Sequence, residues 1–405
     1  MPPASSPPRS DLAALKARAS ARIDGERAAL LDLSARIHAH PELCFEETRA
    51  AGWLCDYLES RGLAVERGAY GLETAFAARA GGGGPRVAVL CEYDALPGIG
   101  HACGHNVIAA AGAGAGVALA AVVAETGGSV VVLGTPAEEG GGGKVLMGRA
   151  GAFADVDAAM MIHPASLELI GMNVLAISAV EVEYRGRAAH AAAAPHAGIN
   201  ALDGLVTAYQ AIAQLRQHIR PSERVHGIIT DGGQKPNIVP ERASGLFYVR
   251  AADERRLARL KERVHACFQA GALASGAELH TCANGEDYSD MWTNPTLAAA
   301  YEANLAALGR HVEHAPPEHI SGSTDMGNVS KLVPAIHPMV AIAPPRVALH
   351  TPEFATWAAA ESGQQGVIDG AKALALTGID VLCSPDLRAA MRAAFAAEQL
   401  SLPQP

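Results

Sequence analysis

Residues 91–106 read "CEYDALPGIGHACGHN" and concentrate Asp, His and Cys residues in a chain dominated by Ala, Gly and Val. This stretch follows a short apolar segment, "VAVLC" (87–91), which is typical of a buried strand, and it precedes an Ala- and Gly-rich segment (107–124) long enough for a buried helix. In an open α/β sheet, ligands bind beyond the carboxyl ends of the strands. The Asp, His and Cys residues of this loop therefore predict a functional site at the edge of a sheet.

Strand-like and helix-like segments alternate through most of the chain. Further buried strands are predicted at 129–135 and 157–163, and the alternation favours a largely parallel sheet covered by helices on both faces. Further along, the pattern changes to strand, helix, two strands, helix, strand, which is typical of a compact α+β unit. We therefore predict an α/β domain formed by residues 1–176 and 288–405, with an inserted α+β domain at 177–287.

The composition argues against several classes of protein. The 405 residues have a formal net charge of −10 and no block of like charges, so no nucleic-acid partner is predicted. The run at 107–124 is mostly Ala and Gly and lies between polar motifs, which favours a buried helix over a membrane span. The N-terminal segment lacks the apolar core of a signal peptide, and the seven cysteines have no regular spacing. These features predict a cytoplasmic protein with free thiols and no membrane partner.

Residues that can bind metals follow several predicted strands. An Asp follows one strand, a pair of Glu residues follows the next, a His ends a third, another His comes after a fourth, and a Cys-x-His pair begins a helix. These residues are Asp94, Cys103, His105, Glu138, Glu139, His163 and His350. Taken singly, each is more often a solvated or structural residue. Their shared position at the carboxyl ends of strands predicts one metal site.

Two alternative interpretations of these motifs explain less. The run "GGGGK" (140–144) is not a phosphate-binding loop, because Glu138 stands where that motif needs its first Gly and Val145 replaces the Ser or Thr. Cys103 could be a nucleophile with His105 as its base. Residues two apart at the start of a helix do not ordinarily face each other, however, which weakens this pairing.

Five motifs together resemble the M20 family of metallopeptidases. In chain order they are "EYDALPGIGHACGHN", "GTPAEEGGGGK", "GRAAHAAAAPHAGINALDG", "SGSTDMGNVS" and "HTPEF". They are similar to its amidohydrolase branch, subfamily D, which includes aminobenzoyl-glutamate hydrolase, amino-acid conjugate amidohydrolases and β-alanyl dipeptidases of the peptidase M20 domain-containing protein 2 type. The wider branch commonly has Asp where this chain has Glu92 and Asn106, and both departures fit the dipeptidase-like members.

The resemblance implies a centre of two divalent metal ions, zinc or manganese. The residues that match the family's metal ligands are Cys103, His105, Glu139, His163 and His350. Cys103 takes the position that bridges the two ions. Glu138 would be the general acid/base, because it stands next to a ligand without being one, and Asp94 would orient a ligand.

The resemblance also implies that the inserted domain completes the active site. His190 matches the residue that stabilises the oxyanion, and Asn237 and Arg250 match substrate-binding positions. From the residues alone, His190 is more often an exposed loop residue. The family's lid domain also forms a dimer contact, so a homodimer through this domain is expected, with His190 of one subunit reaching the metal centre of its partner.

The function implied by the resemblance is hydrolysis of a small amide or peptide bond by a metal-activated water. The expected substrates are dipeptides, including β-alanyl dipeptides, and N-acyl amino acids. One alternative is an amidohydrolase of the aminobenzoyl-glutamate type. Another, of a different class, is a non-catalytic metal-binding regulatory relative. Such a protein is expected to have lost Glu138 or a metal ligand, and this chain retains them.

Overall fold

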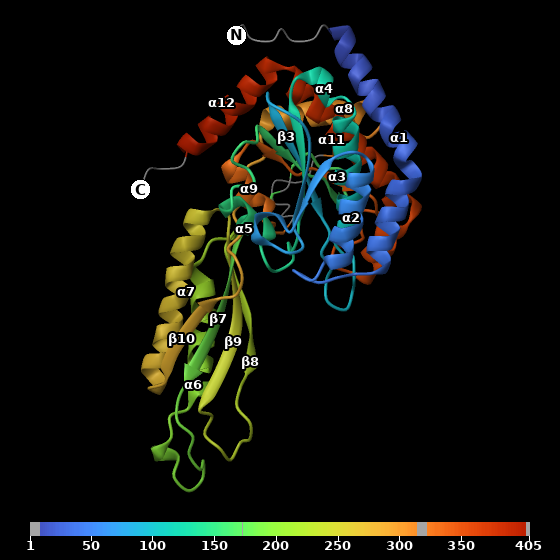
Figure 1. The fold of residues 1–405 in the computed structure, drawn as a ribbon. Coiled ribbons are helices and arrows are strands. Elements are labelled where there is room, and N and C mark those ends of the chain that lie inside the picture. The colour runs from blue at the N-terminus through green and yellow to red at the C-terminus, as the bar shows by residue number, and fades with distance from the viewer. Residues whose placement is uncertain (1–8, 172, 314–321, 402–405) are drawn as a thin grey trace. The chain divides into compact units, whose positions relative to one another are not determined.

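The computed structural model of the chain (Figure 1) describes residues 9–171, 173–313 and 322–401. The chain divides into two compact units, which are described separately. Unit 1 comprises Met1–Asn173 and Met291–Pro405, and unit 2 comprises Val174–Asp290. Ser321, the first residue of the "SGSTDMGNVS" motif, lies outside the described residues.

Unit 1 is built on a six-stranded sheet with the strand order β1-β2-β4-β3-β5-β11. Strands β4, β3, β5 and β11 are parallel, and β2 and β1 continue the sheet antiparallel. The prediction of a mostly parallel sheet is confirmed. Strands β1 and β2 were not predicted, because "AVER" and "FAARAG" contain no apolar run. The strands are β1 (Ala64–Arg67), β2 (Phe76–Gly81), β3 (Arg86–Glu92), β4 (Ser129–Thr135), β5 (Ala158–Met160) and β11 (Ala335–Ile336).

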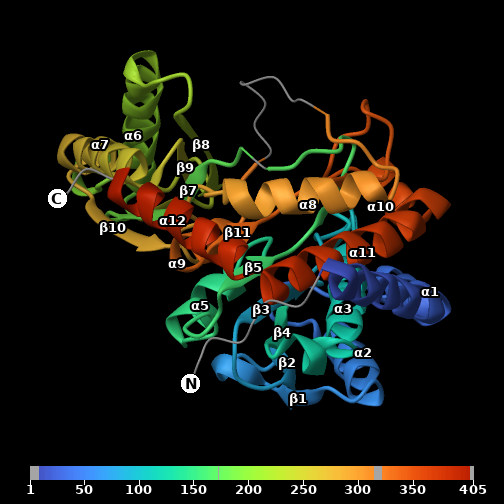
Figure 2. The same ribbon diagram turned by 90° about the horizontal axis from the view of Figure 1, so that it is seen from above.

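Helices cover both faces of this sheet (Figure 2). Helices α1, α2, α3, α8 and α11 share one apolar core with the strands, and α5 and α9 belong to a second core on the other face. None of the helices among the described residues is long and apolar enough to span a membrane. The helices of unit 1 are α1 (Arg9–Ala39), α2 (Thr48–Ser60), α3 (His105–Ala120), α4 (Val123–Thr126), α5 (Gly143–Arg149), α8 (Pro295–Ala307), α9 (Met326–Leu332), α10 (Pro352–Ala359), α11 (Glu361–Cys383) and α12 (Pro385–Ser401).

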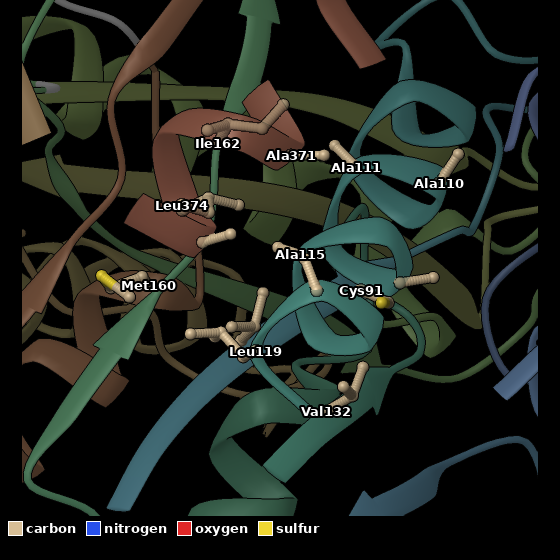
Figure 3. Close-up of a cluster of buried hydrophobic side chains, with 14 of the residues drawn as sticks. Cys91, Ala110, Ala111, Ala115, Leu119, Val132, Met160, Ile162, Ala371 and Leu374 are labelled. Carbon is tan, nitrogen blue, oxygen red and sulfur yellow. The ribbon is translucent and has the colours of Figure 1, made fainter. Parts of the chain in front are cut away.

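Small residues allow α3 to lie directly on the sheet. A Cβ atom at Gly112 would stand 2.5 Å from the carbonyl oxygen of Leu90, and one at Gly116 would stand 2.1 Å from the Val132 side chain. Figure 3 shows Ala111 of α3 next to Ala371 of α11, with Ala115 on the same side of the helix. This close packing fixes the position of the first turn of α3, which begins with His105.

The predicted strand at 157–163 is wrong in its extent. Strand β5 ends at Met160, and His163 begins a separate strand, β6 (His163–Ala165), which pairs in parallel with β12 (Met339–Ala341). The partner strand explains the break. Pro338 lies between β11 and β12 and has no N–H group to donate to a neighbouring strand. The amides of Met161 and His163 nevertheless donate to the carbonyl oxygens of Ile336 and Pro338, so the two segments stay side by side across the break.

Unit 2 is a four-stranded antiparallel sheet with the order β10-β7-β9-β8 and two helices in its core. The predicted sequence of strand, helix, two strands, helix, strand is confirmed. The side chain of Asn200 caps the first helix by accepting hydrogen bonds from the amides of Leu202 and Asp203. The elements are β7 (Ala176–Arg185), α6 (Ala201–Leu215), β8 (Arg224–Asp231), β9 (Arg242–Ala251), α7 (Glu254–Ser275) and β10 (Glu278–Ala283).

Candidate metal centre and active site

The metal-binding side chains predicted in unit 1 lie together. The Sγ atom of Cys103 is 3.5 Å from Nε2 of His163 and 3.3 Å from Nε2 of His350. Glu139 Oε1 lies 3.4 Å from His350 Nε2 and 3.8 Å from His105 Nε2. Two groups of three ligand atoms, each within 4.8 Å of one another, both contain Cys103. These groups are Cys103, His105 and His163, and Cys103, Glu139 and His350.

These residues fit a pair of divalent cations. Thiolate, imidazole and carboxylate groups are the ligands that bind zinc, and imidazole and carboxylate also bind manganese. The Nε2 atom of His105 and the Oε1 atom of Glu139 are buried and form no hydrogen bond among the described residues. Buried polar atoms without a partner are costly, and a cation in each of the two groups would give one of these atoms a partner. Cys103 belongs to both groups, so it would serve both ions if each group held one.

Backbone geometry brings Cys103 and His105, at the start of α3, close to β6. His105 is the first residue of α3, and Gly104 before it has φ +80°. A Cβ atom at Gly104 would stand 2.6 Å from Cγ of Pro164, the residue that follows His163. Gly104 is therefore needed both for its positive φ and for this close approach. His350 also has positive φ, 62°, although it is not a glycine.

Asp94 connects two of the ligands. The Nδ1 atom of His105 lies 2.8 Å from the Asp94 carbonyl oxygen and 3.1 Å from Oδ1, so the neutral imidazole donates from Nδ1 and presents Nε2 to the centre. The backbone amide of Glu139 donates to Asp94 Oδ2 over 2.9 Å. Burial opposes the charge of Asp94, but His105 and this amide outweigh it and lower the pKa to about 2. As a carboxylate, Asp94 therefore holds the imidazole of His105 and the backbone of Glu139 in place.

Glu138 has the environment of a proton-transfer group. It is buried beside the ligands, and burial together with the charges of Glu92 and Glu139 holds its pKa well above the ordinary value. A buried carboxyl group beside the ligand residues is placed to accept a proton and to return it.

The backbone before Glu138 is held in an unusual conformation. Ala137 has φ 58°, which is uncommon for a residue other than Gly. Its amide donates to Oε1 of the buried Glu47 over 2.9 Å, and its carbonyl accepts from the amides of Gly141 and Gly142. Left-handed backbone of this kind costs about 1–3 kcal/mol, so these three hydrogen bonds hold the segment that carries Glu138 in place.

Three buried charged residues beside the centre were not assigned from the sequence. The Nζ atom of Lys144 contacts a carboxylate oxygen of Glu92 and lies 2.6 Å from Asp325 Oδ1. All three residues are fully buried. The available signals were a Glu at the end of the apolar strand "VAVLCE" and a Lys after a Gly run. The run "GGGGK" (140–144) predicts no buried ion pair by itself, because its composition indicates only a loop.

In unit 2, His190 and Asn237 lie together. The amide of Ala191 donates to the Asn237 carbonyl, and His190 forms a β-bridge with Ile238. Both residues are exposed. Arg250 lies at the other end of β9 and pairs with Ile177 at the start of β7. Unit 2 therefore brings two of the three predicted residues together and places Arg250 apart from them.

Comparisons with known proteins identify the family. A family model of the peptidase dimerisation domain matches residues 176–275. The Xaa-Arg dipeptidase of Mus musculus is 42% identical over an alignment that covers 95% of this chain and 93% of that protein. The chain belongs to the M20 metallopeptidase family. One of the subunits of the p-aminobenzoyl-glutamate hydrolase of Escherichia coli strain K12 is 33% identical, with 71% of this chain and 64% of that protein covered.

A solved structure shows the same M20 fold. A dinuclear metal-binding M20 peptidase from Bacillus subtilis matches with a TM-score of 0.67 at 21% identity, covering 89% of this chain and 99% of that one. The predicted family, fold class and reaction class are confirmed. This M20 protein is a hydrolase of small amide or peptide bonds that depends on divalent metal, and a non-catalytic regulatory relative is not supported.

Proposed function

We propose that this M20 enzyme is a dipeptidase in which two divalent ions, zinc or manganese, are held by Cys103, His105, Glu139, His163 and His350. The observation that carries the proposal is the pair of ligand groups that share Cys103, with Glu138 buried beside them. When bound, such ions lower the pKa of a water molecule and polarise the carbonyl group of the substrate.

The proposed role of Glu138 is to transfer one proton. Its carboxylate accepts a proton from the attacking water as the new C–O bond forms. It then donates that proton to the leaving nitrogen as the C–N bond breaks, which returns the carboxylate to its initial state. Asp94 keeps Nδ1 of His105 protonated throughout and thus keeps Nε2 available as a ligand.

We assign stabilisation of the oxyanion to His190. Its Nδ1 atom accepts hydrogen bonds from the amides of Ala192 and Ala193 over 3.3 and 3.1 Å. In the neutral imidazole the proton is therefore on Nε2, which makes Nε2 a donor suited to a developing negative charge. Asn237, held beside His190, and Arg250 are proposed to bind the substrate, with its free carboxylate meeting one of them.

A homodimer through unit 2 is part of this proposal. The match to the peptidase dimerisation domain covers most of unit 2. Strand β8 is an edge strand of the sheet, and it exposes Ile228 and Ile229 at 62% and 43% of their surface. An edge strand with exposed apolar side chains favours pairing with another chain. We propose that β8 pairs across a two-fold axis and that His190 serves the metal centre of the partner subunit.

The proposed location of the enzyme is the cytoplasm. All seven cysteines are free, and Cys103 must stay reduced to serve as a ligand.

The proposed substrates are dipeptides with a basic C-terminal residue, because the mouse relative that aligns over almost the whole chain is an Xaa-Arg dipeptidase. The test is a panel of Ala-Arg, Ala-Lys, β-alanyl-Lys, Ala-Glu, N-acetyl-Arg and aminobenzoyl-glutamate, assayed with the manganese- and zinc-loaded enzyme. The expected result is the highest kcat/KM for Ala-Arg and Ala-Lys. A preference for aminobenzoyl-glutamate or Ala-Glu would contradict the proposed specificity and favour the alternative amidohydrolase.

A further inference from the structure

Glu92, the last residue of β3, faces the same centre as the proposed ligands. Its side chain is fully buried, and its Oε1 atom lies 3.1 Å from Nε2 of His105. Neither atom forms a hydrogen bond among the described residues, although they are within hydrogen-bond distance. Two buried polar atoms thus approach each other without the alignment that an N–H···O bond requires.

The separation of these two atoms is that of two ligands on one cation. Nitrogen and oxygen ligands bind zinc at about 2.0–2.2 Å, which puts two neighbouring ligand atoms about 2.9–3.5 Å apart. The distance from Glu92 to His105 falls in this range, as does the distance from Glu139 to His350. Because His105 donates from Nδ1 to Asp94, its Nε2 atom is the one available to a metal.

The second carboxylate oxygen of Glu92 is held in place by Lys144. Oε2 contacts Nζ of Lys144, whose charge is also balanced by Asp325, 2.6 Å away. Lys144 thus holds one carboxylate oxygen of Glu92, and the other oxygen, Oε1, has no hydrogen-bond partner. Metal-binding carboxylates are commonly oriented in this way by a hydrogen bond to the oxygen that does not bind the metal.

We propose that Glu92 is a further metal ligand, bound through Oε1 to the ion that His105 binds, and that Lys144 and Asp325 position it. This inference rests on the proposed metal centre and adds a sixth ligand to the five that were derived from the sequence motifs. Glu92 is a hard oxygen donor, so it shifts the preference of that ion toward manganese, whereas the thiolate of Cys103 favours zinc.

The experiment titrates metal-free protein with Mn²⁺ and follows the electron paramagnetic resonance signal of free Mn²⁺. For Glu92→Gln, which keeps the size of the side chain but removes its charge, one class of site should bind Mn²⁺ at least about 10-fold more weakly than in the wild type. The matched control is Glu168→Gln, which changes another buried carboxylate of unit 1, 2.9 Å from Arg310. This control should titrate as the wild type does.

Each outcome decides a different claim. Equal Mn²⁺ affinities of Glu92→Gln and wild type would overturn the assignment of Glu92 and leave the metal centre intact. Failure of the wild type to bind Mn²⁺ or Zn²⁺ would overturn the centre itself. If Glu92→Gln does not fold, anomalous diffraction from Mn²⁺-soaked wild-type crystals replaces the titration. A Glu92 oxygen within about 2.5 Å of a manganese position supports the proposal, and one beyond about 3.5 Å contradicts it.

Discussion

The Sγ atom of Cys103 lies 3.3 Å from Nε2 of His350, although 247 positions separate them in the chain. One residue precedes α3 and the other follows β12, so the fold rather than local sequence brings them together. Because Cys103 also lies 3.5 Å from His163, its sulfur is the common point of the centre.

His105 and His350 belong to different ligand groups, so each should be needed for a different ion. His105→Ala and His350→Ala should each lose one of the two ions and retain the other, and both should lose activity. The measurement is metal content per chain by elemental analysis after dialysis. Loss of both ions in each variant, with the fold retained by circular dichroism, would show that the two groups are not separate sites.

Glu138→Gln should separate metal binding from catalysis. Gln cannot transfer the proton, so kcat should fall by about two to four orders of magnitude, while the metal content stays at the wild-type level. Single-turnover kinetics with Ala-Arg and elemental analysis on the same preparation check both statements. Near-normal turnover would mean that another group is the general acid/base.

Glu47 should make the stability of the metal-free protein depend on pH. Burial and then the charge of Asp94 raise its pKa from 4.5 to about 7. Below pH 4.5 both the folded and the unfolded state hold the proton. Between pH 4.5 and 7 only the folded state does, so the free energy of unfolding falls as pH rises through that window. Above pH 7 Glu47 is ionised in both states, and the cost of burying its charge lowers the free energy of unfolding in full.

The test is urea denaturation of wild type and Glu47→Gln in the presence of a chelator, at pH 5 and pH 8. From pH 5 to pH 8, the free energy of unfolding of Glu47→Gln should rise relative to that of the wild type by on the order of 2–3 kcal/mol. The reason is that Gln has no charge to bury, yet its side chain can still accept a hydrogen bond from the amide of Ala137. Parallel behaviour of the two proteins would show that Glu47 is ionised in both states throughout.

The trans action of His190 can be tested by mixing two inactive variants, Glu138→Gln and His190→Ala. If His190 serves the partner, each mixed dimer has one intact site. Up to about a quarter of the wild-type activity should then return, since half of the dimers are mixed. If His190 serves its own subunit, every site stays defective and mixing restores nothing. Unmixed samples of each variant are the controls.

Apolar runs and strand-end residues were sufficient to predict the parallel strands β3 and β4 of unit 1 and the site at their carboxyl ends. The segments "VAVLC" and "SVVVLGT" predict buried strands. Their parallel arrangement then places Asp94 and Glu139 at the same edge of the sheet, beyond the carboxyl ends of β3 and β4. The pattern of unit 2 was equally readable, because alternating burial along β7 and β9 follows alternating polarity in the sequence.

Other features depend on tertiary contacts and could not be read locally. Strand β6 begins at His163 because it pairs with β12, whose first residue, Met339, lies 176 positions later in the chain. The ion pairs of Lys144 with Glu92 and Asp325 join residues 52 and 181 positions apart. No local pattern distinguishes a Lys that will be fully buried between two carboxylates from one on a solvated turn.

The most direct test of the shared metal centre is the metal content of Cys103→Ala. After loading with Zn²⁺ or Mn²⁺ and dialysis, the wild type should retain both ions, and a single ligand variant such as His350→Ala should retain one. Because Cys103 is common to both ligand groups, Cys103→Ala should retain less metal than either single histidine variant and should have no measurable activity, with an unchanged circular dichroism spectrum. Retention of both ions by folded Cys103→Ala would contradict the account.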